Sequence, residues 1–238
     1  MDGSTRVAEL PASHGARWIA ESFRMFRAYP IQWMGLTAGW ISITFALLII
    51  PFLGGVLANF LQPAFFASFA IAGYRQSAGE RVVMGDLFGG FRRHMRSQVN
   101  LGAVLLLSEI AIFAIMAAMG LPLAGEGDGF TMADYVESLQ GKEWILAFGF
   151  LLTVLVKGAL WFAPPLIAFH GMPTMHAIRW SLYAALANLG AMMVYGATLL
   201  ALFFVGAIPW GAGLVVVLPL MAISSFVSYR EVFEARPA

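Results

Sequence analysis

Two oppositely charged residues stand inside long apolar stretches of the sequence. Glu109 lies in LLLSEIAIFAI, 13 positions beyond Arg96, and Lys157 lies in VLVKGALWFAPPLIAFHG, 14 positions beyond Glu143. At about 1.5 Å per helical residue, either distance reaches the middle of a hydrocarbon core about 30 Å thick. A charge there costs about 2.5–3.5 kcal/mol on insertion scales, so we expect the two side chains to form an intramembrane ion pair.

Two chemistries fit such a pair. A buried structural pair would pin two neighbouring antiparallel helices together, whereas a proton- or ion-coupling site would use the same charges in a transport path. Proton relays usually carry more than one intramembrane acid, and Glu109 is the single acid within these stretches. The sequence therefore favours the structural interpretation and leaves the coupling site as the alternative.

The segment HGMPTMH sets two imidazoles and two thioethers close together, a combination that suits Cu(I). These candidate ligands are His170, Met172, Met175 and His176. Methionine also fills gaps in apolar packing, and the chain contains 13 of them, so we favour residues of the membrane interface over a copper site. Cysteine is absent, which excludes disulfides, thiolate metal sites and cysteine nucleophiles. We expect no cofactor.

The strongest basic patch comprises Arg92, Arg93 and Arg96, with Arg75 and Arg81 nearby. It borders two apolar stretches, so contact with anionic lipid headgroups explains it better than nucleic-acid binding. We assign this contact to Arg75, Arg92, Arg93 and Arg96. Nucleophile–base pairs, carboxylate pairs, phosphate loops and metal-ligand helix motifs are missing from the sequence, so we expect no enzymatic activity.

The composition predicts that membrane-spanning helices hold these residues. Of 238 residues, 60% are hydrophobic and 11% are charged, whereas soluble domains carry about 25% charged residues. The uncharged runs 28–74 and 180–229 are each long enough for two spans, which divide at IPFLGG and AIPWGAG. Residues 97–120 and 144–169 supply one span each. The sequence predicts an all-α integral membrane protein with six transmembrane helices in three hairpins.

The positive charges predict the orientation. Twelve of the 14 lysines and arginines fall on one side of the predicted spans. Lys142 alone lies on the other side, in a loop with Glu126, Asp128, Asp134, Glu137 and Glu143. Residues 1–27 hold four arginines and no apolar core of a cleavable signal peptide. We expect a multi-pass protein of the bacterial inner membrane with both termini in the cytoplasm.

Each hairpin repeats one order of features: an amphipathic interfacial helix, a straight span and a span that contains proline. The pseudo-repeats cover about 14–78, 82–171 and 172–231, and together they form a single membrane domain. The interfacial stretches are ARWIAESFRMFRAYP, GDLFGGFRRHMRSQVN (with Asp86 as N-cap) and PTMHAIRWSLYAALAN. Proline removes a helical hydrogen bond and kinks the axis, here at Pro63, at Pro164 and Pro165, and at Pro219.

Two amides, Asn59 and Gln62, stand beside Pro63. Polar side chains within spans usually hydrogen-bond between helices or to the carbonyl that a proline frees. We favour that structural role, and the alternative is a polar lining for a small cavity.

The order of features resembles an uncharacterised family of six-helix proteobacterial inner-membrane proteins. More loosely, it is similar to the membrane domain of some glycerophosphodiester phosphodiesterases. The segments that carry the likeness are HGARWIAESFRMFRAYPIQWMGL, LQPAFFASFAIAGYR, GDLFGGF and APPLIAFHGMPTMHAIRWSLYAALAN. The resemblance covers nearly the whole chain. It implies a six-helix membrane fold and no assigned activity, and the catalytic domain of those phosphodiesterases has no counterpart here.

Taken together, these features predict a non-enzymatic inner-membrane protein that handles lipids or scaffolds a membrane-protein partner. The alternative is a small permease or ion-coupled carrier that uses Glu109 and Lys157. A continuous polar cavity that reaches the pair from both sides favours transport, whereas a dry bundle with lateral lipid grooves favours lipid handling. Three pseudo-repeats also differ from the paired inverted repeats of many secondary transporters.

Overall fold

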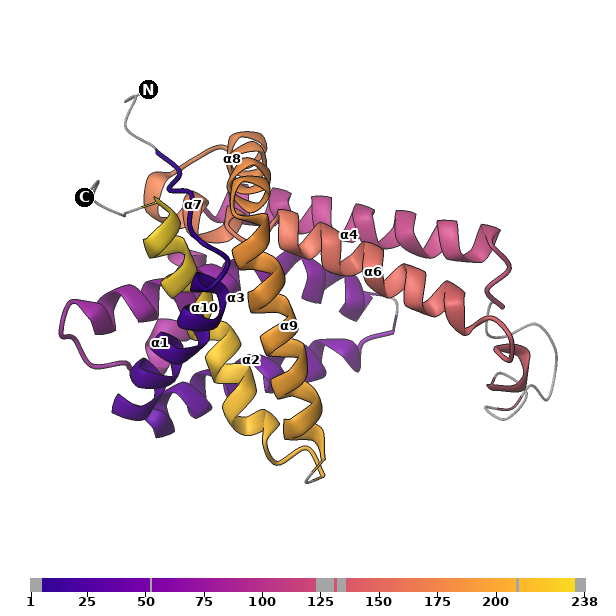
Figure 1. Ribbon diagram of the computed structural model, residues 1–238, viewed down its shortest axis with the longest axis horizontal. Coiled ribbons are helices and arrows are strands. Elements are labelled where there is room, and N and C mark those ends of the chain that lie inside the picture. Colours follow the sequence, from indigo (N-terminus) through magenta and orange to yellow (C-terminus); the bar gives the residue numbers. More distant parts are fainter. Residues whose placement is uncertain (1–5, 52, 123–130, 132–135, 209, 234–238) are drawn as a thin grey trace.

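The computed structural model describes residues 6–51, 53–122, 131, 136–208 and 210–233, and these residues form helices and turns without a strand (Figure 1). In chain order the helices are α1 His14–Ala28, α2 Pro30–Leu48, α3 Leu53–Ser77, η1 Met84–Phe88, η2 Gly90–Arg92, α4 Met95–Ala118, α6 Glu143–Ala159, α7 Ala163–His170, α8 Thr174–Ala187, α9 Leu189–Ala207 and α10 Leu214–Phe233. Six segments are long and apolar enough to cross a membrane: α2, α3, α4, α6 with α7, α9 and α10. The predicted all-α membrane fold with six spans is confirmed.

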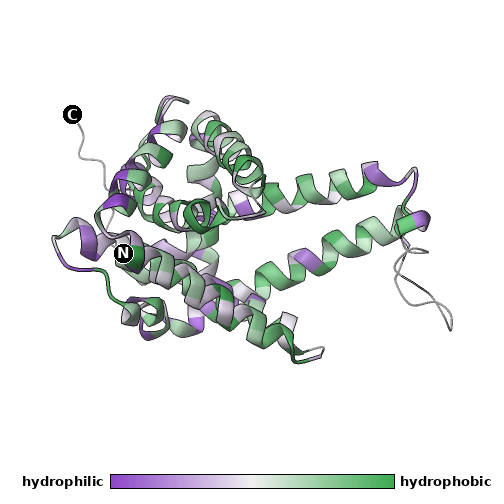
Figure 2. Cartoon of the chain, turned by 90° about the horizontal axis from the view of Figure 1, so that it is seen from below, coloured by the Kyte–Doolittle hydropathy of each residue, from purple (hydrophilic) through white to green (hydrophobic). Residues whose placement is uncertain are grey.

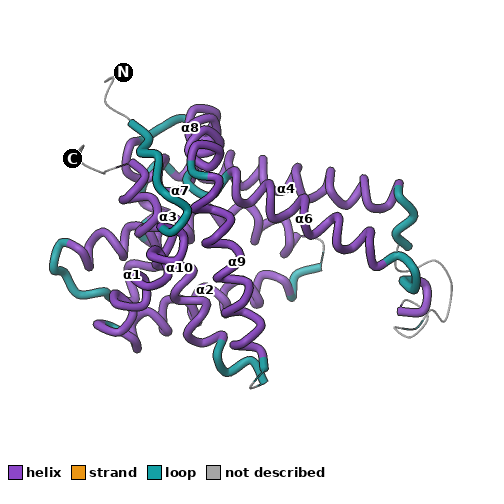
Figure 3. Tube along the Cα trace, in the orientation of Figure 1, coloured by secondary structure: helices purple, strands orange, loops and turns teal. Residues whose placement is uncertain are grey.

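Three hairpins, α2–α3, α4–α6 and α9–α10, diverge from a common base. The base consists of α1, α7, α8, η1, η2 and the adjoining halves of α3, α4 and α10. Figure 3 shows the outer ends of the three hairpins at separate points, with the α4–α6 arm reaching farthest. Hydrophobic residues run along the hairpins, and hydrophilic ones gather mostly at the base and at the far end of the α4–α6 arm (Figure 2).

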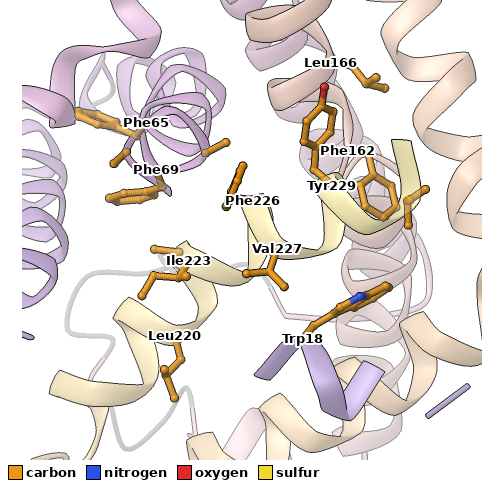
Figure 4. Packing of buried hydrophobic residues seen from close by; sticks show 14 of the residues in the cluster. Trp18, Phe65, Phe69, Phe162, Leu166, Leu220, Ile223, Phe226, Val227 and Tyr229 are labelled. Carbon is orange, nitrogen blue, oxygen red and sulfur yellow. The ribbon is translucent and has the colours of Figure 1, made fainter. Parts of the chain in front are cut away.

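The core lies in the base and is organised around α10. About two thirds of the α10 span and half of the α3 span are buried, against about one sixth for the spans formed by α2, α6 with α7, and α9. Figure 4 shows Ile223 and Phe226 of α10 turned toward α3, and Tyr229 turned toward Phe162 at the start of α7. The outer halves of the hairpins expose large apolar side chains such as Phe204, as expected of surfaces that face acyl chains.

The first helix, α1, buries its apolar face against α9 and α10. Trp18 is fully buried there, and its indole N–H donates to Glu231 at 2.8 Å. The chain just before α1 is bound to the same region, because the Ala8 amide donates to the Val232 carbonyl at 2.8 Å. Asn188, which is buried between α8 and α9, completes the attachment by bonding the backbone of Leu10 and Ala8. The first of the three predicted interfacial helices is therefore a packed part of the core.

The second predicted interfacial helix is wrong, because residues 84–92 form two short 3-10 turns. Glycines at 85, 89 and 90 lower the helix propensity of this segment. The backbone of Gly90 lies so close to Ala64 of α3 that a Cβ would overlap its carbonyl oxygen, and its amide donates to Ser68 Oγ at 2.9 Å. Asp86 is not the N-cap. It is the third residue of η1, and its carboxylate accepts the Val83 amide at 2.8 Å.

The fourth span is broken rather than kinked. Helix α6 ends at Ala159, and Pro164 and Pro165 lie in the first turn of α7, where their missing N–H groups need no helical partner. The buried Ser181 of α8 holds the break, because its hydroxyl accepts the Phe162 amide at 3.0 Å and donates to the Ala159 carbonyl at 2.7 Å. The other two prolines, Pro63 and Pro219, lie inside α3 and α10.

The acidic loop falls partly outside the structural description. Glu126, Asp128 and Asp134 belong to the residues that are not described, whereas Lys142 and Glu143 stand at the start of α6. The predicted orientation of this loop therefore remains a prediction from charge.

Candidate functional site

The structure brings Glu109 of α4 and Lys157 of α6 together. Lys157 Nζ lies 2.9 Å from Glu109 Oε1, a charge-assisted hydrogen bond. Neither side chain is enclosed, because 37% of the Glu109 side chain and 40% of the Lys157 side chain are exposed. This pair therefore differs from the buried structural pair that the sequence favours.

The break in the fourth span explains how this position holds a lysine. Because α6 ends at Ala159, Lys157 lies in the last turn of that helix. The C-terminal end of a helix carries a partial negative charge of roughly half an elementary unit, which stabilises an ammonium group in the last turn. The consecutive prolines begin the next helix. The lysine and the prolines that follow it thus belong to one structural feature, a helix end within the span.

A pocket of about 200 Å³ surrounds the pair, and we call it the intramembrane pocket. Its wall combines residues of the first two hairpins: Trp40, Thr44, Ala58, Asn59, Gln62, Glu109 and Lys157. Helices α3 and α4 meet closely beneath it, since a Cβ on Gly102 would come within 2.6 Å of Phe60 Cα. The sequence indicates the pair and the two amides but not Trp40 and Thr44, because ordinary residues of an apolar span carry no signal of a shared cavity.

The polar groups of this pocket are only partly satisfied. Asn59 Nδ2 donates to the Gly55 carbonyl at 3.1 Å, one turn back in its own helix, instead of to the carbonyl that Pro63 frees. Thr44 Oγ1 donates to the Trp40 carbonyl at 2.9 Å. The Gln62 amide and the Trp40 indole N–H have no hydrogen-bond partner among the described residues. The amides thus line the cavity, which was the alternative that the sequence left open.

A second pocket of about 290 Å³ lies at the base, where α3 ends and η1 and η2 follow, and we call it the basal pocket. Three arginines line it, together with one carboxylate, two glycines and two aliphatic side chains: Arg75, Arg92, Arg93, Asp86, Gly85, Gly89, Ile71 and Val83. The close approach of Gly90 to α3 holds η2 against the pocket wall.

The arginines of the basal pocket differ in their charge balance. Arg75 is held by the buried Asp86 and, through Nε, by Glu80 at 2.7 Å. Arg92 and Arg93 are exposed, and neither forms an ion pair within the described part of the chain. Arg96, in the first turn of α4, is also exposed but is not part of the pocket wall. Of the four arginines assigned to headgroup contact, Arg92 and Arg93 therefore have free charge inside a pocket.

The four candidate copper ligands have different surroundings. His170 shares a 2.7 Å hydrogen bond with the Tyr229 hydroxyl, and Met172 packs against the core of the base. Met175 and His176 are exposed on α8. In the described residues no group of three or more His, Asp or Glu side chains is placed to hold a metal ion.

One curated protein is similar over nearly the whole chain. It is a "probable inner membrane protein" of Burkholderia thailandensis, 26% identical over 237 residues, which cover 93% of this chain and 83% of that protein. No family model and no solved structure matches. The match supports an inner-membrane family and, with the six spans, a multi-pass location in the inner membrane. It does not extend to glycerophosphodiester phosphodiesterases, so that part of the resemblance stays a prediction.

Proposed function

We propose that this protein is a non-enzymatic inner-membrane protein that handles anionic lipids, with the headgroup held in the basal pocket. One observation carries the proposal: Arg92 and Arg93 line a pocket at the end of two spans, and no carboxylate among the described residues pairs with them. Guanidinium groups form strong, directional hydrogen bonds with phosphate oxygens. A phosphodiester headgroup therefore supplies the charge that the pocket lacks.

The surroundings of the pocket fit a lipid better than a free anion. The distribution of arginines predicts that the base faces the cytoplasm, where anionic lipids attract each nearby basic residue by about 1 kcal/mol. Ile71 and Val83 give the pocket an apolar edge, and large apolar side chains cover the diverging hairpins. A headgroup in the pocket can thus keep its acyl chains against these apolar surfaces.

The test is mass spectrometry of the lipids that copurify with the protein. Replacing Arg92, Arg93 and Arg96 with glutamine is expected to deplete phosphatidylglycerol and cardiolipin relative to phosphatidylethanolamine. The matched control replaces Arg17, Arg27 and Arg179 with glutamine, which removes the same charge. These three arginines are also exposed and have no carboxylate partner among the described residues. Unchanged lipid ratios in the first variant would leave its arginines with a topological role only, and equal depletion in both would indicate non-specific attraction.

A second candidate, a small permease or ion-coupled carrier, draws support from the open setting of the Glu109–Lys157 pair. A coupling group must exchange protons or ions with a cavity, and this pair lines one. In proteoliposomes that enclose a pH-sensitive dye, proton flux above that of empty vesicles, lost in Glu109→Gln, is expected of such a carrier. Equal flux in both proteins would remove this candidate.

A further inference from the structure

We propose that the intramembrane pocket binds a small zwitterionic group that carries one ammonium and one phosphate or carboxylate. The ligand ammonium pairs with Glu109, and the ligand anion pairs with Lys157. The proposal rests on this pocket alone and does not depend on the anionic-lipid function of the basal pocket. It names a ligand class for a cavity that the lipid-handling proposal does not use.

The Glu109–Lys157 pair has unused hydrogen-bonding capacity. The bond between Lys157 Nζ and Glu109 Oε1 is the only hydrogen bond that either side chain makes with the described residues. An ammonium group has three donors, and a carboxylate has about four acceptor sites. In the hydrocarbon region water does not freely satisfy such groups, so polar atoms left open there require a polar occupant.

The other polar side chains of the pocket also have free hydrogen-bonding groups. Three side chains that line this cavity each have a polar group without a partner among the residues described. These groups are the Gln62 side-chain amide, the Asn59 side-chain oxygen Oδ1 and the Trp40 indole N–H. Their oxygens can accept from an ammonium, and their N–H groups can donate to an anionic oxygen. An indole ring also attracts cations. The wall therefore offers partners for both halves of a zwitterion.

The charge balance of the pocket favours a ligand with one charge of each sign. The pocket is neutral overall, because one carboxylate faces one ammonium. A ligand of single charge would leave an uncompensated charge at this depth, which is costly. A zwitterion lets the ligand ammonium take Glu109 and the ligand anion take Lys157, so that every charge keeps an opposite partner. A volume of about 200 Å³ suits a headgroup or a small amino acid.

The ligand can come from a lipid or from solution, and the probes separate these sources. Purified protein in detergent is titrated by calorimetry with dihexanoylphosphatidylethanolamine, with free glycerophosphoethanolamine and with 4-aminobutyrate. Saturable binding of at least one probe is expected. Binding of the short-chain lipid alone identifies a lipid headgroup as the source, whereas binding of either free compound identifies a soluble one. Dihexanoylphosphatidylglycerol has the same chains but no ammonium and is expected to bind at least tenfold more weakly.

The deciding variant is the double substitution Glu109→Gln with Lys157→Met, which leaves no charge in the pocket and is expected to keep the fold. Its affinity for the bound probe is expected to fall at least tenfold. The control is Lys142→Met with Glu143→Gln, which removes one charge of each sign at the start of α6, outside the pocket. Wild-type affinity in the pocket variant, tighter binding of phosphatidylglycerol or binding of none of the probes would each overturn the proposal. Copurifying anionic lipid is measured in the same variants, so that failure here and failure at the basal pocket are distinguishable.

Discussion

Removing one partner of the Glu109–Lys157 pair is expected to damage stability more than removing both. Glu109→Gln leaves an unpaired ammonium in the membrane, and Lys157→Met leaves an unpaired carboxylate. Breaking a fully buried pair in this way costs about 3–5 kcal/mol. Here 37% and 40% of the two side chains are exposed, so the protein encloses the unpaired charge only in part. We therefore expect about 2 kcal/mol for each single substitution.

Thermal unfolding in detergent provides the assay. For a chain of this length 1 kcal/mol corresponds to a shift in Tm of roughly 2–4 °C, so each single variant is expected to lose about 4–8 °C. The double variant contains no unpaired charge and is expected to unfold within about 2 °C of wild type. The coupling free energy of the cycle is then about 3–4 kcal/mol. Additive losses in the double variant would show that the side chains do not interact and would refute the arrangement of α4 against α6.

Three other perturbations test the fold. Ser181→Ala removes the hydroxyl that bonds Ala159 and Phe162 across the break and is expected to cost about 1–3 kcal/mol, seen as a lower Tm; an unchanged Tm would mean that the break does not need this hydroxyl. Gly102→Ala is expected to cost about 1–3 kcal/mol, because the new Cβ would lie 2.6 Å from Phe60 Cα. The control Gly196→Ala places its Cβ in open space and should be neutral or slightly stabilising. Similar Tm values for the two variants would contradict the close approach of α3 and α4. Reporters fused at positions 85 and 175 and at the C-terminus should read cytoplasmic and one at position 130 periplasmic, and a cytoplasmic signal at position 130 would overturn the predicted orientation.

The six spans could be predicted from the sequence because they depend on local properties. An uncharged run of sufficient length forms a helix in a membrane whatever its neighbours are, and the turns at IPFLGG and AIPWGAG divide the two longest runs. The depth of Glu109 and Lys157 could be counted for the same reason. A charge in a span also needs a partner, and the chain contains one at matching depth.

Other features that depend on contacts between distant residues were not predictable. The break in the fourth span is held by Ser181, about twenty residues farther along the chain. The turns η1 and η2 replace an amphipathic helix because Gly90 rests on the backbone of α3. Arg75 looks like a headgroup ligand in the sequence, yet the structure gives it Asp86 and Glu80 as partners. In each case the deciding atom belongs to another element, and hydrophobic periodicity carries no record of it.

The packing of α1 against α10 constrains the order in which the chain can assemble. Trp18 is made early in translation, but Glu231, which accepts its indole N–H, is made more than two hundred residues later. The three hairpins can enter the bilayer one after another, because each pairs neighbouring segments. The base must wait until α10 has left the ribosome, and until then the apolar face of α1 lacks one of the two helices that cover it. A nascent chain that stalls before α10 therefore leaves the apolar face of α1, with Trp18 and Phe26, incompletely covered, and chaperones and membrane proteases can recognise such an unfinished molecule.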